Sequence, residues 1–268
     1  MVRFVGLHPG GSGRWRLLAT GCVAVAVLGL VLSGSALATG TTTPTLSTTI
    51  RVADSDGQEV TGPEPLGSEV FDTAVLGNTV SGTPTGTVTY NLFEFSCPSF
   101  PVWGEPVPLN ADGSVPNSAN TPPLAAGSYA FRASYSGDAN YRSATGGCEV
   151  FKIAPAQPRV TTTVENAADG KPVSGALAPG STVYDSAAIG PTVPGFRPSG
   201  TVAYQFFHNG SCGGTPVAAG NVGVGDPSAN EGPLAAGRYS FEAEYNGDSN
   251  YRPATGACEA FVVGNRSP

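Results

Sequence analysis

The sequence predicts an all-β protein built from two similar sandwich domains, and three observations lead to this prediction. A stretch of 29 residues occurs twice, at positions 123–151 and 233–261, with 20 identical residues. Five of the nine differences fall at every second residue from Ser128 to Ser136, which is the period of a β-strand. After residue 38 the chain is rich in Gly, Pro, Thr and Ser and has no apolar stretch with helical spacing. That composition is typical of short strands joined by turns.

The first 38 residues have the layout of a secretory signal. Three arginines precede an apolar run at positions 17–32, and Ala36-Leu37-Ala38 supplies the small residues of a cleavage site. We expect cleavage after Ala38. The alternative is an uncleaved anchor, because positions 17–38 are about the ~20 residues that span a bilayer.

Cleavage would leave 10 basic and 20 acidic residues, a formal charge of −10. Because an acidic surface repels nucleic acid and anionic lipid, we expect no nucleic-acid partner. A membrane partner is expected only if the N-terminal segment stays attached. Residues 39–44 are Thr-rich and end in Pro44, so they predict an extended tether.

The internal repeat extends well beyond the 29-residue stretch and sets the domain boundaries. Residues 56–62 match 169–175, residues 68–72 match 181–185, and Cys97 matches Cys212. We expect domains at 45–154 and 159–264, a linker with two prolines at 155–158 and a tail at 265–268. The first copy is five residues longer between Cys97 and Pro123, and we place this insertion around Trp103.

Within the first copy we expect strands at residues 48–52, 70–76, 86–93, near 107 and 115, at 128–135 and at 149–153. About seven short strands separated by turns are typical of an immunoglobulin-like sandwich. Both copies also contain Leu-Ala-Ala-Gly-x-Tyr-x-Phe-x-Ala-x-Tyr-x-Gly-Asp-x-Asn-Tyr. This motif resembles the signature of the bacterial immunoglobulin-like domain repeats of secreted and surface proteins. The resemblance implies that the hydroxyls of Tyr129 and Tyr239 bond back to the preceding loop, and it brings no catalytic residues.

Four cysteines follow the signal segment: Cys97, Cys148, Cys212 and Cys258. Disulfides are expected in an exported protein, and pairing within each copy is the simplest of the three connectivities. In a plain sandwich Cys97 follows the third strand and Cys148 begins the last, so a bond requires the segment after Phe95 to fold back. A zinc site is the alternative, but close CxxC spacing and histidine partners are missing.

Two repeated turns are candidates for calcium binding, through Asp138 and Asn140 in the first copy and Asp248 and Asn250 in the second. The competing interpretation is structural, because Asp and Asn at turns accept hydrogen bonds from nearby backbone amides. Two oxygen ligands per turn fall short of the ~6 to 8 that calcium takes. We therefore favour the structural interpretation and expect no metal or cofactor.

Catalytic motifs are missing from the sequence after residue 38. Its single histidine, His208, has no counterpart in the first copy and is expected on the surface. No nucleophile elbow or phosphate-binding loop occurs. The acidic residues are spread along strands and turns, so the sequence does not locate a two-carboxylate site. Trp103 is a possible binding residue; we favour the alternative, a hydrophobic plug over the end of the sandwich.

These observations predict an exported, monomeric, non-enzymatic module at the cell envelope or in the medium. Its role would be structural or adhesive, and its partner an extracellular protein or carbohydrate. The alternative is a small secreted hydrolase or metal-dependent factor on the same scaffold. The final residues, 262–268, show neither an apolar anchor nor a wall-sorting motif.

Overall fold

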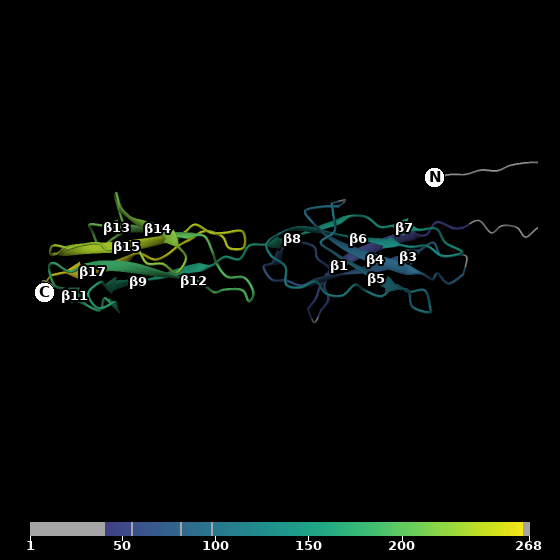
Figure 1. Cartoon of the computed structure of the whole chain (residues 1–268), viewed down its shortest axis with the longest axis horizontal. Helices are drawn as coiled ribbons and strands as arrows, with labels where there is room; N and C mark the ends of the chain where they lie inside the picture. Colours follow the sequence, from purple (N-terminus) through teal and green to yellow (C-terminus); the bar gives the residue numbers. More distant parts are fainter. Residues whose placement is uncertain (1–40, 55, 81, 98, 265–268) are drawn as a thin grey trace, which may run out of the picture. The chain divides into compact units, whose positions relative to one another are not determined.

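The structure is a computed structural model that describes residues 41–54, 56–80, 82–97 and 99–264. The expected signal segment, its cleavage site and the expected tail at 265–268 lie outside the described residues. Every regular element in the described part is a strand (Figure 1). Within it, no helix is long and apolar enough to cross a membrane.

The first sandwich packs a two-stranded sheet against a larger one. β1 pairs with β3 along its whole length, and the larger sheet has the order β2-β8-β6-β4-β5, with β7 on the end of β6. The strands are β1 (Thr45–Val52), β2 (Glu64–Pro65), β3 (Val70–Gly77), β4 (Thr87–Glu94), β5 (Trp103–Pro108), β6 (Gly127–Tyr135), β7 (Ala144–Thr145) and β8 (Glu149–Ala154).

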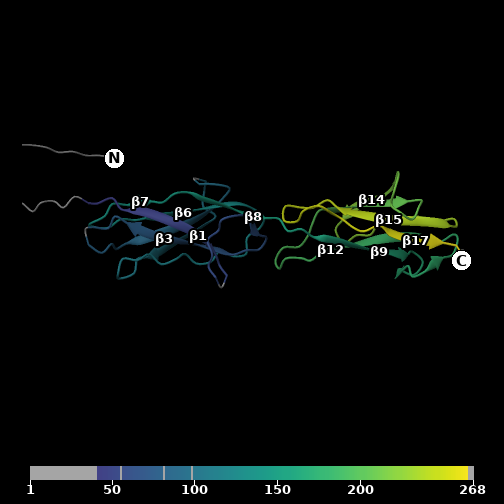
Figure 2. The same ribbon diagram turned by 180° about the vertical axis from the view of Figure 1, so that it is seen from behind.

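The second sandwich repeats this topology with one additional short strand. Its sheets have the orders β10-β9-β12 and β11-β17-β15-β13-β14, and β16 pairs with β15. Figure 2 shows these strands from behind. They are β9 (Arg159–Asn166), β10 (Lys171–Pro172), β11 (Ala176–Leu177), β12 (Val183–Gly190), β13 (Thr201–Phe207), β14 (Val217–Gly223), β15 (Gly237–Tyr245), β16 (Ala254–Thr255) and β17 (Glu259–Val263). Two immunoglobulin-like sandwiches therefore make up the described chain, as the strand pattern predicts.

The alternating, mostly aromatic residues on the inner face of the central strand form the middle of each sandwich core. In β6 these are Tyr129, Phe131, Ala133 and Tyr135, all buried. Their counterparts in β15 are buried as well. The hydroxyl of Tyr129 donates to the Ala125 carbonyl at 3.1 Å, and that of Tyr239 donates to the Ala235 carbonyl at 3.0 Å. The hydroxyl contact expected for both tyrosines is thus present.

Two expectations about the segment between β4 and β6 need correction. Val115 lies outside any strand and packs against the core from an irregular segment. Trp103 begins β5 and faces Leu92 of β4, and Pro108 at the other end of β5 occupies the ladder position that Gly223 occupies in β14. The extra five residues of the first copy therefore lie after Pro108, between β5 and β6, and not around Trp103.

The segment expected to be a tether is part of the first sandwich in the portion described. Thr42 forms a parallel bridge with Tyr141. Its amide donates to the Asn140 carbonyl at 3.0 Å, and its carbonyl accepts from the Arg142 amide at 2.9 Å. Ala156, within the expected linker, makes the same pair of bonds with the second sandwich. In each copy these contacts extend the first strand toward its N-terminal side.

Candidate functional site

The two disulfides join the expected pairs, Cys97 to Cys148 and Cys212 to Cys258, with Cα–Cα distances of 6.0 and 5.8 Å. Since β6 lies between β4 and β8, the first bond has to cross the outer face of β6. The chain reverses at Phe95, which has a φ of 71°, and the Phe95 amide donates to the Ser128 carbonyl at 2.8 Å. This is the folding back that the bond requires. It also explains why Ala130 is buried although it points away from the core.

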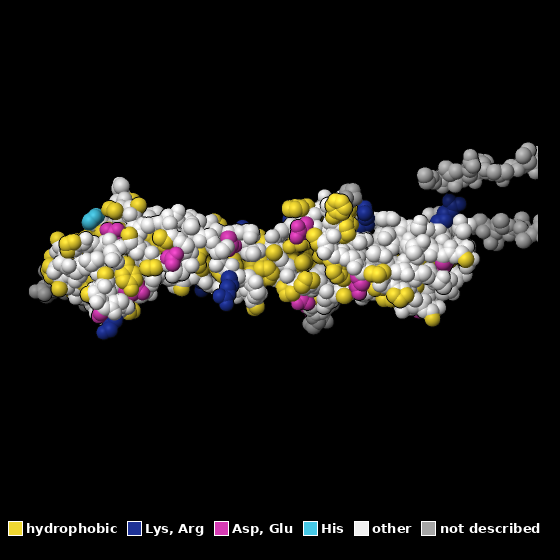
Figure 3. Space-filling view, in the orientation of Figure 1, with side chains coloured by type: hydrophobic (Ala, Val, Ile, Leu, Met, Phe, Trp, Pro, Cys, Tyr) yellow, Lys and Arg dark blue, Asp and Glu magenta, His cyan; other side chains and the backbone are white. Residues whose placement is uncertain are grey.

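The first of these crossings holds an apolar loop against the sheet. We call residues 95–97 and 99–102 the clamped loop. Phe95, Phe100 and Val102 in it are 75%, 96% and 55% exposed, and Figure 3 shows hydrophobic side chains gathered around this loop. The Val102 amide donates to the Leu92 carbonyl at 2.8 Å. Hydrogen bonds and a covalent bond thus fix a loop whose large apolar side chains face solvent.

The corresponding turn of the second sandwich is built differently. Residues 209–214 read Asn-Gly-Ser-Cys-Gly-Gly and bond both to one another and to β15, where the Cys212 amide donates to Ser240 Oγ at 3.0 Å. The Ser211 amide donates to Asn209 Oδ1 at 2.9 Å, and Asn209 Nδ2 donates to the Gly213 carbonyl at 2.8 Å. His208, just before this turn, is exposed as expected and contacts the ring of Phe206 edge-on at 5.2 Å. The large apolar side chains of the clamped loop are therefore specific to the first sandwich.

Trp103 lies at the end of the clamped loop and points toward the core. Its ring meets Phe131 edge-on at a centroid distance of 6.4 Å, and it packs against both buried clusters of the first sandwich. The side chain is only half-buried. These contacts favour the hydrophobic plug, and the most exposed aromatic ring of this region belongs to Phe100 instead.

The two calcium candidates are saturated by the protein itself. Asp138 accepts bonds from the amides of Asn140 and Tyr141 through Oδ1, at 2.7 and 2.8 Å, and from the amide and hydroxyl of Thr85 through Oδ2, at 2.7 and 3.0 Å. Asp248 repeats these four bonds with Asn250, Tyr251 and Ser199. Partial desolvation acts to raise the pKa of Asp138, but the amide hydrogen bonds outweigh it and lower the pKa to about 2. The geometry gives both aspartates a structural task, to pin the turn against a neighbouring loop.

Each sandwich also buries one aspartate that the sequence analysis does not predict. Asp72 of β3 and Asp185 of β12 are 0% exposed, and neither oxygen of either side chain has a hydrogen-bond partner within the described residues. Burial, together with the nearby Glu149, raises the pKa of Asp72 to about 7. Burial, with Glu259 and Glu165 nearby, does the same for Asp185. A sequence signal for both existed, because each aspartate occupies an inward position of a strand, two residues after a buried valine.

These carboxyl groups do not form a hydrolytic site in the described structure. A catalytic carboxyl must reach the substrate, and both aspartates are enclosed by the sandwich. Among the residues that the structure describes, no group of three or more His, Cys, Asp or Glu side chains could hold a metal ion.

Comparison with known proteins identifies no family for this chain and finds only distant similarity to solved structures. No protein-family model matches the sequence, and none of the curated proteins does. Among solved structures, the fibronectin(III)-like modules of CbhA from Clostridium thermocellum match at 11% identity and a TM-score of 0.26, over 80% of this chain and 92% of theirs. The C-terminal domain of the Streptococcus pyogenes antigen I/II-family protein AspA matches at 9% identity and 0.29, over 81% and 99%. Red sea bream transglutaminase matches at 11% and 0.33, over 82% and 31%.

Proposed function

We propose that this chain is an exported, non-enzymatic module of the bacterial immunoglobulin-like repeat type, which holds or presents a binding surface at the cell envelope or in the medium. The clamped loop is the observation that carries the proposal. A monomeric soluble domain seldom leaves large apolar side chains in one exposed group unless they contact something. Here Phe95, Phe100 and Val102 are exposed on a loop that is covalently fixed.

The fixed backbone supports a binding role because it lowers the entropy lost on association. A loop that is already ordered loses little further freedom when it meets a partner, and phenylalanine side chains bring large apolar area with few rotatable bonds. Aromatic rings of this kind suit either a protein surface or the apolar face of a sugar. The disulfides also favour an oxidising compartment outside the cytosol.

The surroundings of the buried aspartates and of His208 support a non-enzymatic role. The buried aspartates have no access to solvent, and His208 contacts aromatic rings. A hydrolase on this scaffold, the alternative, would need an accessible carboxyl pair or metal.

The proposal is tested with the double variant Phe95→Ser/Phe100→Ser, compared with Val217→Ser at an exposed apolar position of the second sandwich. Labelled protein is applied to a glycan array and to the producing cells, followed by cross-linking. We expect the wild type and Val217→Ser to bind alike and the double variant to lose binding while melting at the same temperature. Equal binding by all three proteins, or a hydrolytic activity lost on a single carboxylate substitution, would contradict the proposal.

A further inference from the structure

One edge of the larger sheet in the first sandwich has no partner strand along most of its length. The Phe95 amide donates to the Ser128 carbonyl beside β4. In an antiparallel ladder the N–H and C=O of one residue point to the same neighbouring strand, and successive residues alternate. The main-chain groups of even-numbered residues of β6 therefore face β4, and those of odd-numbered residues face β8. With the register that pairs Tyr129 with Phe151, the main-chain groups of Val150 point away from β6. Beyond this edge β2 pairs only with the last two residues of β8. Val150 therefore presents its N–H and C=O to an open edge.

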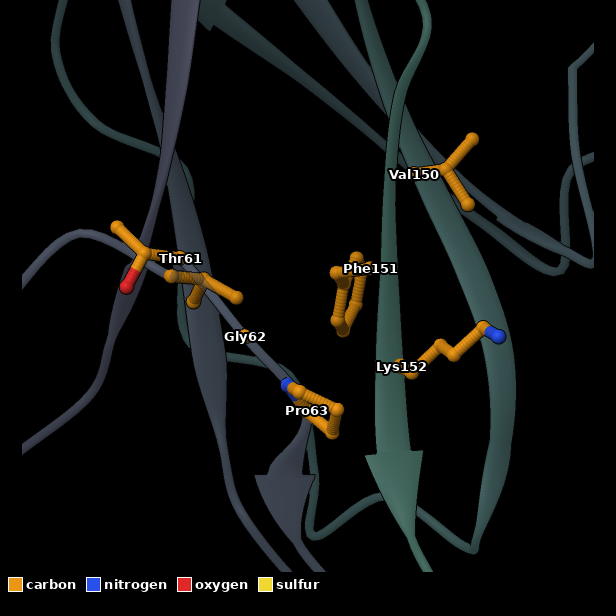
Figure 4. A pocket seen from close by; sticks show the side chains of 7 residues that line it. Thr61, Gly62, Pro63, Val150, Phe151 and Lys152 are labelled. Atoms are coloured by element: carbon orange, nitrogen blue, oxygen red, sulfur yellow. The ribbon is translucent and has the colours of Figure 1, made fainter.

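A groove runs along this edge (Figure 4). Its volume is about 280 Å³, and it is lined by Val60, Thr61, Gly62 and Pro63 on one side and by Val150, Phe151 and Lys152 on the other. The ring of Phe151 lies between the two segments, while Val150 and Lys152 point to the far side of β8. An adjoining space of about 150 Å³ shares Val60, Val150 and Phe151 and continues the groove to Glu59 and Glu149. The groove is thus apolar at its floor and acidic at one end.

The second sandwich has the same groove at the equivalent place. The Asn246 amide donates to the Thr201 carbonyl at 3.0 Å, so the same alternation directs the main-chain groups of Ala260 in β17 outward. A space of about 240 Å³ lies between Val173 and β17 and is bounded by Glu259 and Phe261. Another of about 130 Å³ adjoins it. Because both copies have an open edge, a phenylalanine floor and a terminal glutamate, the groove belongs to the repeated design.

The glutamate at the acidic end has an unmet interaction in both copies. Oε2 of Glu149 and Oε2 of Glu259 are buried, and neither accepts a hydrogen bond from any described residue. A second carboxylate, Glu59 or Glu165, lies near each of them. A buried carboxylate oxygen without a donor is unfavourable, and a lysine or arginine side chain would supply both the donor and the opposite charge.

We propose that these two grooves bind an extended basic peptide segment, which adds as a strand to β8 or β17 and places a lysine or arginine against Glu149 or Glu259. Strand addition takes its affinity from main-chain hydrogen bonds and its selectivity from alternate side chains, and the open edge offers both. The segment from Glu149 to Lys152 is about 13 Å long at the rise of a strand, room for roughly four peptide residues. A second copy is a poor occupant, because the chain after residue 38 carries a charge of −10 and copies repel each other.

The probe is the peptide acetyl-TKVTVKT-amide. It is added to the purified protein, and the hydrogen exchange of the protein's backbone amides is measured with and without it. We expect exchange at the amides of Val150 and Ala260 to slow on peptide binding. Two matched peptides serve as controls: one with glutamate in place of both lysines, and one with the same side chains but N-methylated valines. The glutamate peptide loses two charge pairs and adds repulsion from the carboxylates of the groove. We therefore expect it to bind at least about fivefold more weakly, the upper value for the loss of a single charge pair at a surface.

Variants separate the main-chain and charge contributions. Val150→Pro removes the outward N–H, whereas Val150→Thr keeps it, and we expect only the proline variant to lose protection at the first groove. Glu59→Lys should weaken peptide binding there, whereas Glu244→Lys, at an exposed residue of β15, should not. If Val150→Pro fails to fold, the exchange measurement on the wild type decides. Equal binding of the N-methylated or glutamate peptide, protection elsewhere than Val150 and Ala260, or protection that grows with protein concentration without peptide would overturn the proposal.

Discussion

Replacing Asp72 by asparagine should remove a large pH dependence from the stability of the first sandwich. The carboxyl of Asp72 has a pKa of about 7 in the fold against an ordinary value of 3.8, with burial as the main cause. The nearby backbone amides of Thr73 and Thr49 lower the pKa of Asp72. Because neither carboxyl oxygen accepts a hydrogen bond within the described residues, their effect is smaller than that of burial.

The direction of the pH dependence is set by whether the folded or the unfolded chain holds the proton of Asp72. Between pH 3.8 and about 7 the folded chain holds a proton on Asp72 that the unfolded chain has released. The free energy of unfolding therefore falls as pH rises through this window and levels off above it. Each pKa unit is 1.36 kcal/mol, so a rise of roughly three units gives about 4 kcal/mol as the upper value. Below pH 3.8 both states are protonated and the effect is fully present as stability.

Asp72→Asn is neutral at every pH but leaves an amide without partners, which costs about 1–3 kcal/mol. We expect the variant to be less stable than the wild type near pH 4 and more stable, by about 1–3 kcal/mol, near pH 8. Urea unfolding followed by the fluorescence of Trp103 reports on this sandwich alone, because Trp103 is the single tryptophan after residue 38. Glu244→Gln, at an exposed site, is the control. A wild-type stability that rises from pH 4 to 7, or a variant that keeps the wild-type pH slope, would contradict a raised pKa for Asp72.

Three further predictions concern the supports of the fold. Cys97→Ser with Cys148→Ser should lower the free energy of unfolding of the first sandwich by up to about 4 kcal/mol, the chain-entropy value for a loop of 51 residues; an unchanged urea midpoint would show that the bond does not form. Tyr129→Phe removes the hydroxyl bond to the preceding loop and should cost about 1 kcal/mol in the same assay, and a neutral effect would contradict a structural role for that hydroxyl. Asp138→Ala should destabilise its turn and lower the melting temperature, and because the aspartate oxygens are already occupied, 5–10 mM calcium (roughly tenfold above the weakest extracellular sites) should leave the melting temperature of the wild type unchanged. A calcium-dependent rise would reverse that assignment.

The fold was predictable because its signals are local and repeated. The period-two variation along β6 and β15 identified the buried face, and the duplicated motif located the tyrosine hydroxyl bonds. The position of the five extra residues was not predictable, because it depends on which residue of β5 faces Thr87 across the ladder, and that register is a long-range property. The strand-like β5 was also obscured by its two prolines, which are tolerated because β5 is an edge strand.

The candidate site was less predictable for a different reason. Trp103 is distinctive in the sequence because it is the single tryptophan after residue 38. Exposure is decided by packing, however, and in the structure the exposed ring of this segment is Phe100. The proximity of Asp72 to Glu149 joins residues 77 positions apart, which no spacing rule connects. The open edges of β8 and β17 likewise become visible only when the partners of each strand are known.

The disulfide that crosses β6 also determines how the first sandwich would respond to a stretching force. Cys97 and Cys148 are 51 positions apart in the sequence, and the segment between them includes β5, β6 and β7. Pulled from its two ends, this sandwich can release β1, β2, β3, β4 and β8 but not the enclosed segment, which would otherwise contribute about 170 Å of contour length at ~3.4 Å per residue. Its central aromatic strand would therefore stay within a closed covalent ring, and the extension on forced unfolding would be shortened by that length until the bond is reduced.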